Sequence, residues 1–208
     1  MKMYLSSFRL GNHPERLVEL LGSNKRVAVI PNALDYSDDI KRRKAGVQRE
    51  IDDLVGLGLL AEEVDLRRYF KKSVELGKKL SEFGTVWVRG GNTFVLRRAF
   101  KESGMDEWLI NQRSKNELVY AGYSAGVCIL SPSLKGLEIV DDPDIVNEGY
   151  PKETIWEGLG LIDFAFAPHF ESPGHPETEA VGREVEYYKG HGIKYLALHD
   201  GEVIVIGN

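Results

Sequence analysis

The segment Leu118–Gly126 reads LVYAGYSAG and decides the fold class. Its apolar part, LVYAGY, is typical of a short strand that is buried on both faces of a parallel sheet. The strand meets a turn with the pattern G-x-S-x-G, from Gly122 to Gly126, and a helical run follows. Small residues at both ends of such a turn let the chain reverse from strand to helix within a few residues. We therefore expect a strand–turn–helix unit that exposes Ser124 at the end of the strand.

Apolar runs alternate with charged, periodic stretches on both sides of this segment. The predicted strands are Met3–Phe8, Arg26–Pro31, Val64–Arg67, Thr85–Arg89, Leu118–Tyr123, Phe164–Pro168, Tyr195–His199 and Glu202–Ile206. The predicted helices are Asn12–Leu21, Asp38–Leu57, Lys71–Phe83, Thr93–Phe100, Asp106–Ser114 and Thr178–Lys189. Such alternation predicts an α/β fold of three layers, with a mostly parallel sheet and helices on both faces. Asp200-Gly201 between the last two strands predicts an antiparallel hairpin at the C-terminal end.

Length and composition exclude several classes of protein. The chain has 208 residues, which favours a single domain over residues 1–208. A net charge of −5 without a basic block argues against a nucleic-acid partner. Cys128 is the only cysteine, so an intrachain disulfide and a thiolate metal cluster are both excluded. The sequence has no signal-peptide pattern and no apolar run near the roughly 18 residues that span a bilayer, so we expect a cytoplasmic protein without a membrane partner. A homodimer is compatible with the sequence.

The serine of the G-x-S-x-G turn has the surroundings of a nucleophile. Ser124 would project above the carboxyl ends of the strands, and the Ala125 amide would lie at a helix N-terminus, aimed at developing negative charge. A glycine pair in the sequence RGGNTF follows the strand Thr85–Arg89 and could supply a second amide to an oxyanion hole. The G-x-S-x-G turn could instead serve only the close packing of helix on strand. The RGGNTF segment could be a tight turn in which Asn92 or Thr93 is the N-cap of the helix. The second cluster is not a G-x-G-x-x-G dinucleotide motif.

A serine hydroxyl needs a base within hydrogen-bond reach. His169 directly follows the apolar strand Phe164–Pro168, at the edge where a parallel sheet presents catalytic groups, and it is the predicted base. His175, in the following loop, is the alternative base or a substrate contact. A third, acidic residue would orient the imidazole and stabilise its charged form. The candidates for that role are Glu138, Asp141, Asp142 and Glu171, and spacing alone does not choose among them.

Three blocks of sequence, taken together, resemble the α-aspartyl dipeptidase (dipeptidase E) family. They are GGNTF at Gly90–Phe94, GYSAG at Gly122–Gly126, and Pro168-His169-Phe170 followed by Gly174-His175, in the family's order. That family consists of serine peptidases related to cyanophycinase, on a fold similar to class I glutamine amidotransferases. The resemblance implies an exopeptidase that acts on short peptides, with Ser124 as nucleophile, His169 as base, and Gly91 and Ala125 as the oxyanion donors. It places Glu138 nearest to the family's acidic residue, with Asp141 in reserve.

Two positions depart from the family's pattern. Aspartyl dipeptidases carry an arginine shortly after the Gly-His element that grips the acidic side chain of the substrate, whereas this chain has Glu179 there. Arg89 stands where relatives often have a third glycine, and it could supply a replacement positive charge. We assign Arg89, Asn92, His175 and Glu179 to the substrate-binding part of the site. The preference for an acidic N-terminal residue is therefore open.

The sequence thus predicts a serine peptidase that cleaves short peptides through a Ser-His-acid triad and an acyl-enzyme. The main alternative is a non-catalytic binding or regulatory protein that keeps the pocket. A glutamine amidotransferase is disfavoured because its nucleophile is a cysteine at the elbow, and Cys128 lies beyond the elbow in the following helix. His169, His175, Glu171 and Glu177 lack a recognised metal-ligand spacing, so we expect no metal and no other cofactor.

Overall fold

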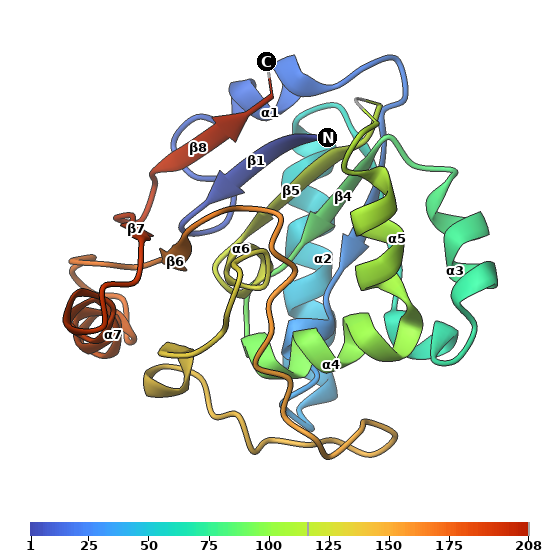
Figure 1. Cartoon of the computed structure of the whole chain (residues 1–208). Helices are drawn as coiled ribbons and strands as arrows, with labels where there is room; N and C mark the ends of the chain where they lie inside the picture. Colours follow the sequence, from blue (N-terminus) through green and yellow to red (C-terminus); the bar gives the residue numbers. More distant parts are fainter. Residues whose placement is uncertain (116, 208) are drawn as a thin grey trace.

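A six-stranded sheet forms the centre of the protein (Figure 1). The computed structural model describes residues 1–115 and 117–207. The strand order is β3-β2-β4-β5-β1-β8, and β1 to β5 run parallel while β8 runs antiparallel to β1. The strands are β1 (Lys2–Ser6), β2 (Arg26–Ile30), β3 (Leu60–Glu63), β4 (Thr85–Val88), β5 (Val119–Tyr123) and β8 (Val203–Ile206). The mostly parallel α/β sheet with an antiparallel C-terminal strand is therefore confirmed.

Helices cover both faces of this sheet, because successive residues of each buried strand point to opposite sides. Val27 and Val29 of β2 pack into a cluster with α1 (Pro14–Leu20) and α2 (Ile40–Gly56). Ala28 and Ile30 point to the opposite, larger cluster. That cluster contains residues of α3 (Ser73–Leu80), α4 (Thr93–Ser103), α5 (Met105–Gln112) and α6 (Ala125–Cys128). No helix within residues 1–115 and 117–207 is long and apolar enough to cross a bilayer.

A small second sheet lies beside the first and corrects one predicted strand pairing. Strand β6 (Ala165–Ala167) pairs in parallel with β7 (Tyr195–Ala197), and α7 (Thr178–Gly190) packs against both strands (Figure 1). The turn at Asp200-Gly201 does join β7 to β8, but β8 pairs with β1 and not with β7. The predicted C-terminal hairpin is thus wrong in its pairing, because each strand finds a nonlocal partner.

A second correction concerns the strand predicted at Val64–Arg67. The observed strand, β3 (Leu60–Glu63), comes earlier, and Leu66–Tyr69 forms the 3₁₀ helix η2. β3 is the edge strand of the sheet, so it does not need an apolar run and Leu60 is exposed. Two further 3₁₀ helices are η1 (Asn32–Leu34) and η3 (Leu137–Ile139).

Candidate active site

The G-x-S-x-G turn forms a sharp elbow between β5 and α6. Ser124 has a positive φ of +49°, with ψ −123°, which is uncommon for a residue that is not glycine. A Cβ atom at Gly126 would lie 2.2 Å from the Val88 carbonyl oxygen, and one at Gly122 would lie 2.6 Å from the same oxygen. Larger residues at these two positions would push the elbow away from β4. The strain and the close packing together hold Ser124 above the sheet.

Ser124 and His169 line one cavity of about 220 Å³ at the carboxyl ends of the parallel strands. Gly91, His175 and Glu177 line the same cavity. No residue in the described part of the chain forms a hydrogen bond with the Ser124 hydroxyl, so the serine and the histidine share a cavity without being hydrogen-bonded to each other. In enzymes without bound substrate, such bonds are often long and tighten only in the complex.

His169 is a buried residue whose ring is held from several sides. Its Nδ1 atom lies 2.6 Å from Oδ1 of Asp200, and its backbone amide donates to the Ser7 hydroxyl at 2.9 Å. The ring stacks on His175, with centroids 3.7 Å apart and planes at 4°, and the edge of Phe8 contacts both rings. With Nδ1 occupied by Asp200, Nε2 is the nitrogen left to accept a proton.

The carboxylate beside His169 is therefore Asp200, and the prediction of Glu138 as the imidazole's partner is wrong. The Glu138 carboxylate accepts from the Gly136 amide at 2.6 Å, on η3. The reserve candidate, Asp141, accepts from the Thr93 amide at 2.7 Å, at the start of α4. Asp142 and Glu171 are likewise not bonded to His169: Asp142 accepts from the Asp144 amide, and the backbone carbonyl of Glu171, not its side chain, contacts His199.

Burial lowers the pKa of His169 below its usual value, while the contact with Asp200 opposes that effect. The nearby His175 lowers the pKa further. The imidazole is therefore neutral at neutral pH and can accept a proton there. Burial raises the pKa of Glu177, and the Asp200 charge adds to that rise.

The two predicted oxyanion donors, Gly91 and Ala125, lie in the turns that follow β4 and β5. Gly91 lines the cavity, and its φ of +148° and its contact with Ala33 exclude a side chain, since a Cβ would lie 2.4 Å from the Ala33 carbonyl oxygen. Ala125 begins α6 directly after Ser124. Within residues 1–115 and 117–207, no acceptor pairs with the amide of Gly91 or of Ala125. Both amides are thus free to donate to a ligand.

Of the four residues assigned to substrate binding, the structure places two on the cavity wall and two outside it. Arg89 and His175 line the cavity. Asn92 does not line it: its side chain caps α4 by accepting from the Val95 amide at 2.9 Å, as the plainer interpretation of the turn predicts. Glu179 is exposed in the first turn of α7 and is also absent from the cavity wall. Asn92 is also held by the bond that its side-chain amide donates to the Asp142 carbonyl at 2.9 Å.

Arg89 reaches the cavity, but a buried carboxylate already balances its charge. Its Nε lies 3.3 Å from Oε1 of Glu50, whose side chain is only 2% exposed. Glu50 also accepts from Trp87 Nε1 at 2.9 Å and from the Tyr123 hydroxyl at 2.8 Å. The charge of Arg89 is therefore paired with a buried glutamate, which makes Arg89 less available to a substrate than an unpaired cation would be.

Replacing Arg89 with methionine should destabilise the protein, because Glu50 would keep a buried charge without a partner. We expect a loss of roughly 3 kcal/mol in the free energy of unfolding, measured by urea denaturation. The double variant Arg89→Met with Glu50→Gln should recover much of that loss. If Arg89→Met alone left the unfolding midpoint unchanged, the assignment of Arg89 to Glu50 would be wrong.

One group of side chains in the cavity has metal-binding chemistry. Potential ligand atoms of His169, His175 and Glu177 lie within 4.8 Å of one another. The two imidazoles, however, lie in nearly parallel planes, so their in-plane lone pairs run side by side and do not converge on one ion. The cluster as it stands suits proton transfer better than tetrahedral coordination.

Comparison with known proteins identifies the family. The sequence profile of peptidase family S51 matches residues 6–208. An uncharacterized peptidase of Listeria monocytogenes is 30% identical over 88% of this chain and 83% of its own length. A protein named peptidase E in Streptomyces coelicolor is 28% identical over 87% of this chain and 68% of its own. The solved structure of a candidate peptidase E from Listeria monocytogenes superposes with a TM-score of 0.73 and 27% identity, covering 98% of this chain and 96% of that one. The chain therefore belongs to peptidase family S51 and is a peptidase.

Proposed function

We propose that this peptidase is a serine-type exopeptidase that hydrolyses short peptides through an acyl-enzyme. Ser124 is the nucleophile, His169 the general base, and Asp200 the residue that orients the imidazole. The observation that carries the proposal is the 2.6 Å contact between His169 Nδ1 and Asp200, in a cavity that Ser124 enters from a strained elbow. A serine hydroxyl is a weak nucleophile, and this arrangement is the one that activates it.

The reaction follows from the protons that these groups can hold. As the Ser124 oxygen attacks the scissile carbonyl carbon, His169 Nε2 takes the hydroxyl proton and the amides of Gly91 and Ala125 donate to the developing oxyanion. His169 then gives the proton to the leaving amine, the C–N bond breaks, and the acyl group remains on Ser124. A water molecule attacks the ester with His169 again as base, which releases the carboxylic acid and restores the serine. Asp200 stabilises the imidazolium in each half of the reaction.

The size and charge of the cavity support the selection of a free peptide N-terminus. The cavity is small, at about 220 Å³, and the Glu177 carboxylate lies in it beside the two histidines. No donor in the described part of the chain hydrogen-bonds to that carboxylate. An unpaired carboxylate next to the base suits the ammonium group of a substrate N-terminus, which would lie within one residue of the scissile bond. This pairing supports exopeptidase action over cleavage within a long chain.

The pH dependence of the reaction should follow His169. The base must be neutral to accept the serine proton, and burial lowers its pKa. We expect kcat/KM to rise with pH as His169 loses its proton below the ordinary histidine value of 6.5 and as Glu177, whose pKa burial raises, becomes a carboxylate. A profile that stays flat from pH 4 to pH 8, measured with a peptide that lacks ionisable side chains, would contradict His169 as the base.

The proposed function is tested by digesting a library of dipeptides and tripeptides and reading the products by mass spectrometry. We expect cleavage next to a free N-terminal residue, and no cleavage of the same peptides after N-acetylation. Cleavage inside longer peptides with blocked ends would contradict the exopeptidase assignment. If no peptide of any length were cleaved, the non-catalytic binding protein would become the better account.

A further inference from the structure

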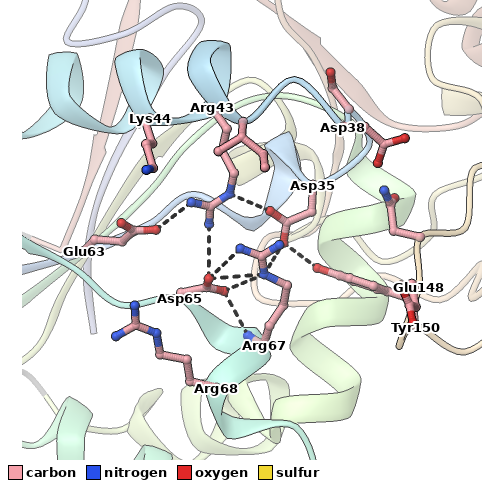
Figure 2. A pocket seen from close by; sticks show the side chains of 13 residues that line it. Asp35, Asp38, Arg43, Lys44, Glu63, Asp65, Arg67, Arg68, Glu148 and Tyr150 are labelled. Atoms are coloured by element: carbon pink, nitrogen blue, oxygen red, sulfur yellow. Dashed lines mark hydrogen bonds and ion pairs between the residues drawn. The ribbon is translucent and has the colours of Figure 1, made fainter.

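We propose that a second cavity, separate from the catalytic one, binds a small zwitterion, namely a free amino acid or a short peptide with an ammonium group and a carboxylate group. The cavity measures about 550 Å³ and lies beside the carboxyl end of β3 and the start of α2 (Figure 2). It shares no wall residue with the cavity of Ser124 and His169, so the inference does not depend on the proposed reaction.

The centre of this cavity's wall is a network of charges that are paired within the protein. Asp35, whose side chain is 1% exposed, accepts from Arg43 Nε at 2.8 Å and from the Tyr150 hydroxyl at 2.6 Å. Beside it, Asp65 accepts from Arg67 Nη2 at 2.6 Å (Figure 2). Because these groups satisfy one another, they fix the wall and leave the recognition of a ligand to the side chains around them.

Four further charged side chains on the wall have no ion-pair partner within residues 1–115 and 117–207. They are Lys44, Arg68, Asp38 and Glu148. Figure 2 shows that the two signs are separated: Lys44 on α2 and Arg68 on η2 lie on the left, whereas Asp38 and Glu148, from two loops, lie on the right. The cavity therefore has a cationic end and an anionic end, and both are available to the charges of a ligand.

Two buried polar atoms on the same wall also lack a hydrogen-bond partner in the described part of the chain. They are Oδ1 of Asn147, which can only accept, and Nη2 of Arg43, which can only donate. Nη2 lies 3.4 Å from Oδ2 of Asp65, within ion-pair range but without a hydrogen bond. Because leaving buried polar groups unpaired is costly, the two atoms favour a ligand that supplies both a donor and an acceptor.

These observations together define the class of ligand. A carboxylate fits the cationic end, where Arg68 can present paired donors to it, and an ammonium group fits the anionic end. An amino acid or a short peptide carries both groups on one small molecule. A phosphate would meet repulsion at the anionic end, and a polyamine would meet it at the cationic end. A free amino acid and a dipeptide present the same two groups, so the test must separate these two sources.

The test is isothermal titration calorimetry with the Ser124→Ala protein, which cannot consume a peptide. The ligands are alanine and Ala-Ala, each in three forms: free, N-acetylated, and amidated at the carboxyl group. None of them has a charged side chain. We expect the free form to bind at least about 10-fold more tightly than either blocked form, because each blocked form loses one charge-assisted contact.

Two double variants, added to the Ser124→Ala protein, locate the site. Lys44→Ala with Arg68→Ala should weaken binding of the free form about 10-fold and leave binding of the amidated form unchanged, because that form has no carboxylate to lose. Asp38→Asn with Glu148→Gln should likewise weaken the free form but not the N-acetylated form. All four side chains are exposed, so both variants should keep the parent's thermal unfolding midpoint.

The matched control is Lys41→Ala, on the same helix as Lys44 but outside both cavities, and it should change none of these affinities. Binding of alanine alone assigns the site to amino acids, and binding of Ala-Ala alone assigns it to peptides. Binding that neither double variant weakens would place the ligand elsewhere and overturn the proposal, as would no saturable binding of either ligand up to about 10 mM. The titration needs no turnover, so its failure is distinct from a failure of the proposed activity.

Discussion

Replacing Ser124 with alanine is expected to lower kcat by about 10⁶-fold, because no other group in the cavity can form the acyl-enzyme and only the weak catalysis by binding and oxyanion contacts remains. The fold should survive, since Ser124 accepts helix hydrogen bonds only through its backbone carbonyl, from Val127 and Cys128 at 2.7 and 2.9 Å. Alanine leaves that carbonyl in place and removes only the hydroxyl.

The loss is measured with a peptide that the parent protein cleaves, together with circular dichroism and a thermal unfolding curve. Ser114→Ala is the matched control, because Ser114 is exposed and lies outside the cavity. It should cleave at the parent rate. Activity of the Ser124→Ala protein within tenfold of the parent would exclude Ser124 as the nucleophile.

The second large effect is expected for Asp200→Asn, with kcat lower by about 10⁴-fold. Asparagine keeps the size of the side chain but carries no charge to stabilise the imidazolium, and its amide can hold the ring in the wrong tautomer. Glu138→Gln is the matched control and should change kcat by less than about 3-fold, since Glu138 bonds the Gly136 amide and not the histidine.

These two variants test which acidic residue acts with His169: Glu138, which the family resemblance favours, or Asp200, which lies beside the imidazole in the structure. Thermal unfolding should be recorded for both, because Asp200 also accepts from the Ser7 hydroxyl at 3.1 Å. A large loss in Glu138→Gln with an active Asp200→Asn protein would contradict the assignment of Asp200.

Local patterns in the sequence predict most of the fold and half of the site. The apolar runs at Arg26–Pro31 and Leu118–Tyr123 correspond to central strands, because a strand buried on both faces must be apolar throughout. The elbow that carries Ser124, and the position of His169 at a strand end, follow from the same local signals. Each of these features depends on residues within one short segment.

Features that depend on distant partners are the ones that the sequence does not predict. Asp200-Gly201 has the composition of a hairpin turn, and only the pairing of β7 with β6 and of β8 with β1 carries Asp200 to His169. The signal that could have found it is an acidic residue directly after a strand, at the same edge as the histidine.

The central claim, that Ser124 is an activated nucleophile, is tested most directly by reaction with a fluorophosphonate, followed by mass spectrometry of the digested protein. The account predicts one adduct, on Ser124, which disappears when His169 is replaced by glutamine, because the hydroxyl then lacks its base. Absence of an adduct on Ser124 in a sample that cleaves peptides, or an adduct that persists without His169, would contradict it.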